Sequence, residues 1–150
     1  MNIHYKNFSH LLLSLLFLAL FCGCAIQLVS ERDEVTLQQM ETLAQEVDHF
    51  FTQLLYIPAS ERDYKSSKSG YLDIEVKLNA LKMRQQIREM NELTLKQVEI
   101  AIELWTRDRK RHQAKENFSD FMVKRYRSQY KRLFLAMIKG EEVKEKQPTK

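Results

Sequence analysis

The sequence contains little glycine, proline and cysteine. Its 150 residues include three Gly and two Pro, far fewer turn-forming residues than an all-β fold needs. The only two Cys are separated by one residue, which excludes a disulfide framework. Hydrophobic residues make up 44% and charged residues 29% of the chain, so its composition is not that of a disordered protein. The net charge of +4 is mild and by itself implies no polyanionic partner.

The longest apolar run lies near the N-terminus. Residues 11–21 (LLLSLLFLALF) follow a polar start and precede Cys22-Gly23-Cys24, an order of zones that is typical of a secretory signal peptide. Gly23 followed by Cys24 resembles the lipobox of bacterial lipoproteins, although Phe21 departs from the usual Leu, Val or Ile. The resemblance implies cleavage between Gly23 and Cys24. It also implies acylation of Cys24 by three chains, palmitate among them.

This reading of the N-terminus predicts where the protein is found. One acyl chain binds a membrane only marginally, whereas three hold a protein there permanently. Ala25 is not the aspartate that resembles an inner-membrane retention signal, so we expect the periplasmic face of the outer membrane. Cleavage would also leave no free thiol in an oxidising compartment. Two alternatives stay open: an uncleaved anchor over residues 11–29, which is just long enough to span a bilayer, and an ordinary secreted signal.

The remainder of the chain predicts an all-α, antiparallel four-helix bundle. Apolar residues recur every three or four positions, which is the period of a helix with one buried side. We expect a signal peptide over residues 1–23, a lipidated tether over 24–29, the bundle over 30–140 and a disordered tail over 141–150. The expected helices cover residues 30–57, 72–90, 94–112 and about 119–139, with a loop over 58–71.

The ends of these helices are predicted from capping residues. Ser30 and Thr94 are expected to begin the first and third helices, and Asn117 or Ser119 the fourth. Gly140 occupies the place of a C-terminal cap. The second helix is ambiguous, because residues 74–78 also alternate like a strand, and we assign its buried side to positions at helical spacing: Val76, Ala80, Met83, Ile87 and Met90.

Charge is unevenly distributed along the chain. Residues 24–104 carry nine Lys or Arg against fourteen Asp or Glu, whereas residues 105–139 carry eleven against three. Two interpretations stay open for the basic segment: a solvated face that pairs with the acidic first helix, or a surface for an anionic envelope partner. Nucleic acid would suit such a segment but is not expected in the periplasm. The cations concerned are Arg107, Arg109, Lys110, Arg111, Lys124, Arg125, Arg127, Lys131 and Arg132.

Side chains that could carry chemistry are few. Glu46-x-x-His49 is one half of the motif that di-metal bundles use, but a second such pair is missing. Haem held by His49 and Met83 or Met137 is the corresponding cofactor alternative. Trp105 is expected in the core, and Tyr126 and Tyr130 are expected at its boundary with solvated hydroxyls. We find no catalytic set, and expect no enzyme activity, no metal and no cofactor.

Several short segments resemble a group of small bacterial lipoproteins without an assigned activity. The resemblance rests on residues 24–30 (CAIQLVS), 81–84 (LKMR), 91–94 (NELT) and 134–140 (FLAMIKG). It implies the lipoprotein location and a helical fold, and it assigns no catalytic residue. We therefore expect a non-enzymatic, lipid-anchored protein that binds another envelope component or has a structural role.

Overall fold

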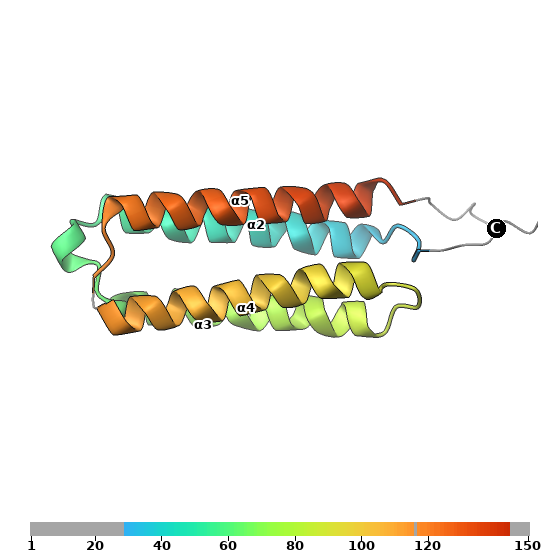
Figure 1. The fold of residues 1–150 in the computed structure, drawn as a ribbon, viewed down its shortest axis with the longest axis horizontal. Coiled ribbons are helices and arrows are strands. Elements are labelled where there is room, and N and C mark those ends of the chain that lie inside the picture. Colours follow the sequence, from blue (N-terminus) through green and yellow to red (C-terminus); the bar gives the residue numbers. More distant parts are fainter. Residues whose placement is uncertain (1–28, 116, 145–150) are drawn as a thin grey trace, which may run out of the picture.

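The computed structural model describes residues 29–115 and 117–144, and these ranges form four long α-helices (Figure 1). They are α2 (Glu34–Tyr56), α3 (Tyr64–Gln86), α4 (Glu92–Lys115) and α5 (Asp120–Glu142), with a short 3-10 helix, η1 (Ala59–Glu61), between α2 and α3. Consecutive helices run in opposite directions, and α2 packs along α5 to close the bundle. The predicted all-α antiparallel bundle is confirmed.

The N-terminal part of the prediction falls outside the described residues. This applies to the signal peptide over residues 1–23 and to the cleavage site at Gly23 and Cys24, and at the other terminus to residues 145–150 of the expected tail. Within the described ranges, none of the helices has an apolar stretch of the length that a bilayer requires.

The two ends of the bundle each bring together distant parts of the sequence. One end, which we call the tether end, contains residues 29–33, the α3–α4 turn and the last turn of α5 (Figure 1). The opposite end, which we call the far end, contains the links between α2 and α3 and between α4 and α5. A helix of 23 residues separates the two ends by about 35 Å, at 1.5 Å per residue.

Capping side chains determine where three of the helices begin. Asp33, Asp63 and Ser119 each accept a backbone N–H from the first turn of the helix that follows, and so satisfy a donor that the helix leaves unpaired. The predicted cap at Ser119 is confirmed. The predicted caps at Ser30 and Thr94 are wrong, because α2 begins after Asp33 and because Thr94 is a buried residue inside α4.

The second half of the predicted loop over residues 58–71 is helical. Asp63 caps α3, which begins at Tyr64, well before the predicted start. Gly70 lies inside this helix, and a Cβ there would stand 2.8 Å from a ring carbon of Phe50. The glycine that suggests a loop in the sequence is therefore a position where α2 and α3 approach too closely for a side chain.

The predicted buried side of α3 is also wrong. Tyr71, Ile74, Leu78 and Leu81 face the core, whereas the residues expected there lie on the outside. Val76 and Met83 are each 68% exposed and Ile87 is 81% exposed. The helix has two apolar sides at helical spacing, and the sequence does not indicate which of them is covered.

The C-terminal boundary differs from its prediction as well. Gly140 lies inside α5, which continues to Glu142 and is capped by Val143. Glu141 is buried, and Lys144 is hydrogen-bonded to Ser30, Asn91 and Thr94. Residues 141–144 therefore belong to the folded bundle, and the predicted tail begins too early.

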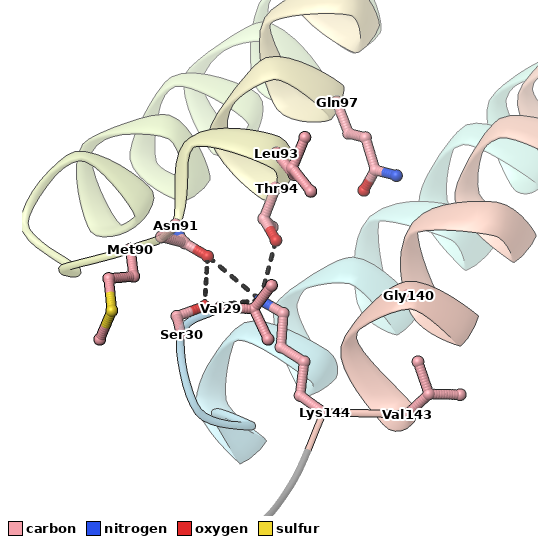
Figure 2. Close-up of a pocket in the computed structure, with 10 residues that line it drawn as sticks. All are labelled: Val29, Ser30, Met90, Asn91, Leu93, Thr94, Gln97, Gly140, Val143 and Lys144. Atoms are coloured by element: carbon pink, nitrogen blue, oxygen red, sulfur yellow. Dashed lines mark hydrogen bonds between the residues drawn. The ribbon is translucent and has the colours of Figure 1, made fainter. Parts of the chain in front are cut away.

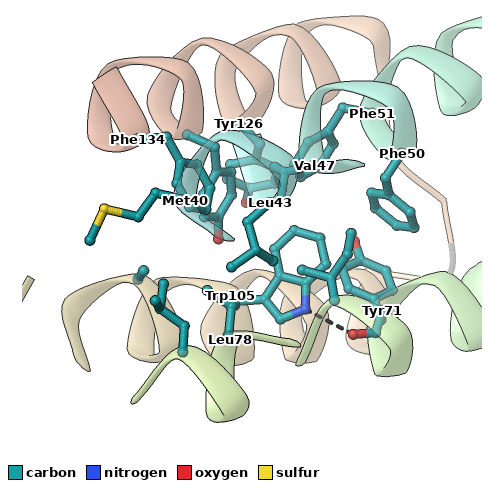
Figure 3. Close-up of a cluster of buried hydrophobic side chains, with 14 of the residues drawn as sticks. Met40, Leu43, Val47, Phe50, Phe51, Tyr71, Leu78, Trp105, Tyr126 and Phe134 are labelled. Carbon is teal, nitrogen blue, oxygen red and sulfur yellow. Dashed lines mark hydrogen bonds between the residues drawn. The ribbon is translucent and has the colours of Figure 1, made fainter. Parts of the chain in front are cut away.

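The core is built around aromatic rings (Figure 3). Trp105 is fully buried, as predicted, and its Nε1–H donates to the carbonyl oxygen of Tyr71 at 2.9 Å. Phe50 and Phe51 of α2 meet its ring edge-to-face at 5.4 and 5.9 Å, a favoured geometry for aromatic pairs. Tyr126 and Tyr130 are buried as well, so their predicted boundary position is wrong.

Candidate functional site

The nine predicted basic residues all lie on α4 and α5, between the far end and the middle of the bundle, where Lys131 and Arg132 are placed. The two helices are neighbours in the bundle, so the structure brings the two sequence clusters together. The nine side chains differ in their contacts, because several of them form ion pairs with acidic residues and the others face solvent.

Two of the arginines join helices. Arg127 on α5 holds Asp48 on α2 through two hydrogen bonds of 2.6 and 2.8 Å, and this contact lowers the pKa of the Asp48 carboxyl. Arg109 on α4 forms an ion pair with Glu75 on α3 at 3.1 Å. The predicted pairing of the basic segment with the acidic first helix is therefore confirmed for Arg127.

Two more arginines lie beside a buried carboxylate. Asp108 is fully buried, with Arg107 Nε at 3.2 Å and Arg111 Nη1 at 3.9 Å. Tyr130 donates its hydroxyl proton to Asp108 at 3.1 Å. Burial, followed by the nearby Asp108 charge, raises the pKa of Tyr130, so the hydroxyl stays protonated as a donor. Arg107 and Arg111 thus compensate a charge inside the bundle.

The remaining cations point to solvent. Within the described ranges, Lys110, Arg125 and Lys131 form no ion pair, and Lys124 reaches Asp120 only at 3.9 Å. Arg132 donates to the hydroxyl of Ser128 at 2.7 Å. The sequence from 121 to 140 contains no acidic residue, so every charged side chain in this part of α5 is a cation. Such a surface can bind carboxylates or phosphates.

A buried histidine that the sequence did not single out lies at the far end. His112 Nε2 is 2.7 Å from the carbonyl oxygen of Arg62, and a carbonyl only accepts, so Nε2 carries the proton. Nδ1 then accepts from the Tyr71 hydroxyl at 3.2 Å. The ring stacks on Phe118 at 4.0 Å. Burial lowers the pKa of His112, which keeps the ring neutral.

Arg62 joins the two links of the far end. Its guanidinium donates to the carbonyl oxygens of Ile57 at 2.8 Å and Phe118 at 3.1 Å, and pairs with Asp120 at 2.6 Å. The side chain is only 3% exposed. The sequence gives no signal of this role, because Arg62 lies in a segment that is predicted to be a loop. The role depends on a contact with Phe118, which is 56 residues away in the sequence.

The tether end contains a second network of buried polar side chains (Figure 2). Lys144 Nζ lies 2.8 Å from Ser30 Oγ, 3.1 Å from Asn91 Oδ1 and 2.8 Å from Thr94 Oγ1. These residues line a pocket of about 220 Å³ together with apolar side chains, among them Leu93. The network ties the segment that leads to the tether to the α3–α4 turn and to the end of α5.

An acidic pair completes this network. Glu141 accepts from Arg88 at 3.0 Å and from Lys144 at 2.6 Å, and its first oxygen also accepts the backbone N–H of Asp33. Asp33 in turn holds Arg84 at 2.7 and 2.8 Å, which lowers the pKa of its carboxyl. Both carboxylates of this network are therefore held in ion pairs.

The residues of the metal and haem alternatives are dispersed. Glu46 is bound to Lys77 on α3, and His49 is exposed. Met83 lies on the outside of α3, whereas Met137 is buried in the core. No three potential metal-ligating side chains lie together in the described ranges, so the Glu46–His49 pair is without the further ligands that such a site needs.

Comparisons of the chain with protein-family models, curated proteins and solved structures gave no match. The resemblance to small bacterial lipoproteins therefore stays a prediction.

Proposed function

We propose that the protein is a lipid-anchored helical module of the bacterial envelope that presents its basic surface to an anionic partner. Acylated Cys24 would hold it at the periplasmic face of the outer membrane, and its role would be binding rather than catalysis. The partner would be an acidic envelope protein or a phosphate-bearing surface.

The outward side of α5 carries this proposal. Arg125 and Lys131 form no ion pair in the described ranges, while Arg107, Arg109 and Arg127 are paired with acidic residues of the bundle. The first described residue, Val29, lies at the tether end, and the basic surface lies between the middle of the bundle and the far end. An anchor at Cys24 would therefore leave this surface accessible to a partner.

The test places a photo-crosslinking amino acid at Ser128, an exposed position among Arg125, Lys131 and Arg132. Crosslinking is carried out in cells that make the full chain. The triple variant Lys110→Glu, Arg125→Glu and Lys131→Glu removes cations that form no ion pair, so we expect a normal fold and loss of the crosslinked species.

The matched control changes net charge by the same amount elsewhere. Lys65, Lys68 and Lys96 are exposed on α3 and α4, and their reversal to Glu is expected to leave the crosslinks in place. Crosslinks that persist in the first triple variant, or that disappear in both, would contradict the proposed role of the basic surface.

A further inference from the structure

A second apolar side runs along the outside of α3. Leu72, Val76, Ala80, Met83 and Ile87 follow one another at intervals of three or four residues, directly opposite the side that enters the core. All five are exposed. An exposed apolar row of this length is unusual on a soluble surface and indicates a contact with another apolar phase or molecule.

The row continues onto the tether end. Met90, three residues after Ile87 in the α3–α4 turn, is exposed as well. Met90 adopts a left-handed backbone conformation with φ of 51°, a conformation that favours Gly or Asn over a large side chain. An apolar residue therefore occupies a strained position at the edge of this surface.

The charged neighbours of the row are held away from it. Lys77 pairs with Glu46 on α2, and Lys82 pairs with Glu99 on α4 at 3.1 Å. These contacts draw the long side chains sideways, toward the adjacent helices, so they do not cover the apolar row.

We propose that this row, which we call the α3 outer face, lies against the phospholipid bilayer that holds the acylated Cys24. The inference rests on the proposed lipid anchor. Only residues 25–28 separate Cys24 from Val29, and five Cα steps span at most about 18 Å. A tether this short gives the bundle a high effective concentration relative to the bilayer. The bilayer therefore has an advantage over any partner that is free in solution.

The arrangement of the helices agrees with this orientation. α3 packs against α2 and α4, and α5 packs against the same two helices, so α3 and α5 lie diagonally across the bundle. With the α3 outer face on lipid, the basic side of α5 points away from the membrane. In this single orientation the α3 outer face contacts lipid and the basic side of α5 stays accessible to a partner.

The test uses single cysteines in the acylated full protein, where Cys24 is blocked and an introduced thiol is the only one free. Met83→Cys lies on the α3 outer face. Leu135→Cys is the matched control, because it replaces an exposed apolar residue on α5 near the same end. Each variant receives an environment-sensitive fluorophore and is placed in phosphatidylethanolamine–phosphatidylglycerol vesicles with or without spin-labelled lipid.

We expect spin-labelled lipid to quench the fluorophore at residue 83 and to leave that at residue 135 unchanged. An unquenched residue 83, equal quenching at both positions, or self-quenching at residue 83 that persists without lipid would overturn the inference, and the last of these would indicate a second copy. The intact mass of the same preparation separates the two proposals. A missing acyl mass refutes the anchor, whereas an unquenched residue 83 on acylated protein refutes only the membrane contact.

Discussion

Arg88 and Glu141, which are 53 residues apart in the sequence, form an ion pair of 3.0 Å at the tether end. The Glu141 side chain is fully buried, and its second oxygen accepts from Lys144. One carboxylate therefore balances two cations that are largely removed from water. This relationship makes the end of α5 part of the fold.

Replacing Glu141 by Gln is expected to lower the free energy of unfolding by about 3 kcal/mol, because it leaves two partly buried cations without a counter-charge. Urea denaturation measures the change. Glu142→Gln is the control, since Glu142 is exposed and a surface change of this kind shifts stability by less than about 0.5 kcal/mol. Equal effects of the two variants would contradict the structural role of Glu141.

Alanine substitutions at two glycines inside helices are expected to change the stability of the protein in opposite directions. At Gly70 the added methyl group would meet the Phe50 ring at 2.8 Å, and overpacking of this kind costs about 1–3 kcal/mol. At Gly140 the nearest atom is 3.9 Å away, so alanine is expected to stabilise the helix by about 0.5–1 kcal/mol. Thermal unfolding of the two variants tests this difference in sign.

Stability is expected to fall between pH 7.5 and pH 5.5 because of His112. Burial lowers its pKa below the ordinary 6.5, so the unfolded chain takes up a proton in this range that the folded chain refuses. Asp33 and Asp48, whose pKa values are also lowered, lose their contributions only at more acidic pH. His112→Gln should flatten the pH dependence of the urea midpoint, and exposed His49→Gln should leave it unchanged.

Met90→Gly is expected to raise stability by about 1 kcal/mol, because glycine adopts a φ of 51° without the steric cost that a side chain incurs. Chemical denaturation measures this gain. A loss of stability would show that the Met90 side chain contributes more to packing than its conformation costs.

Most of the fold could be predicted from apolar spacing alone. α2 and α5 each have a single apolar side, and the buried residues are those that the spacing indicates. α3 has two apolar sides, one buried and one exposed. Periodicity identifies an apolar side of a helix but does not indicate whether that side is buried. Whether Ile74 or Val76 enters the core is determined by tertiary packing.

The polar networks could not be predicted, since each depends on residues brought together by the fold. Arg62 and His112 meet across the far end, and Glu141 meets Arg88 across the tether end. The basic surface was predicted as a set of residues, but its division into bound and solvent-facing cations depends on partners such as Asp48 on another helix.

The intact mass of protein purified from membranes, with a peptide map of its N-terminus, tests the central claim most directly. Residues 1–23 are expected to be absent, and Cys24 is expected to carry the mass of three acyl chains. A chain that keeps Met1 and carries no acyl group would contradict the lipid anchor. Residues 11–29 would then be an uncleaved membrane anchor, and anionic partners on the cytoplasmic side, including nucleic acid, would become the ones to test.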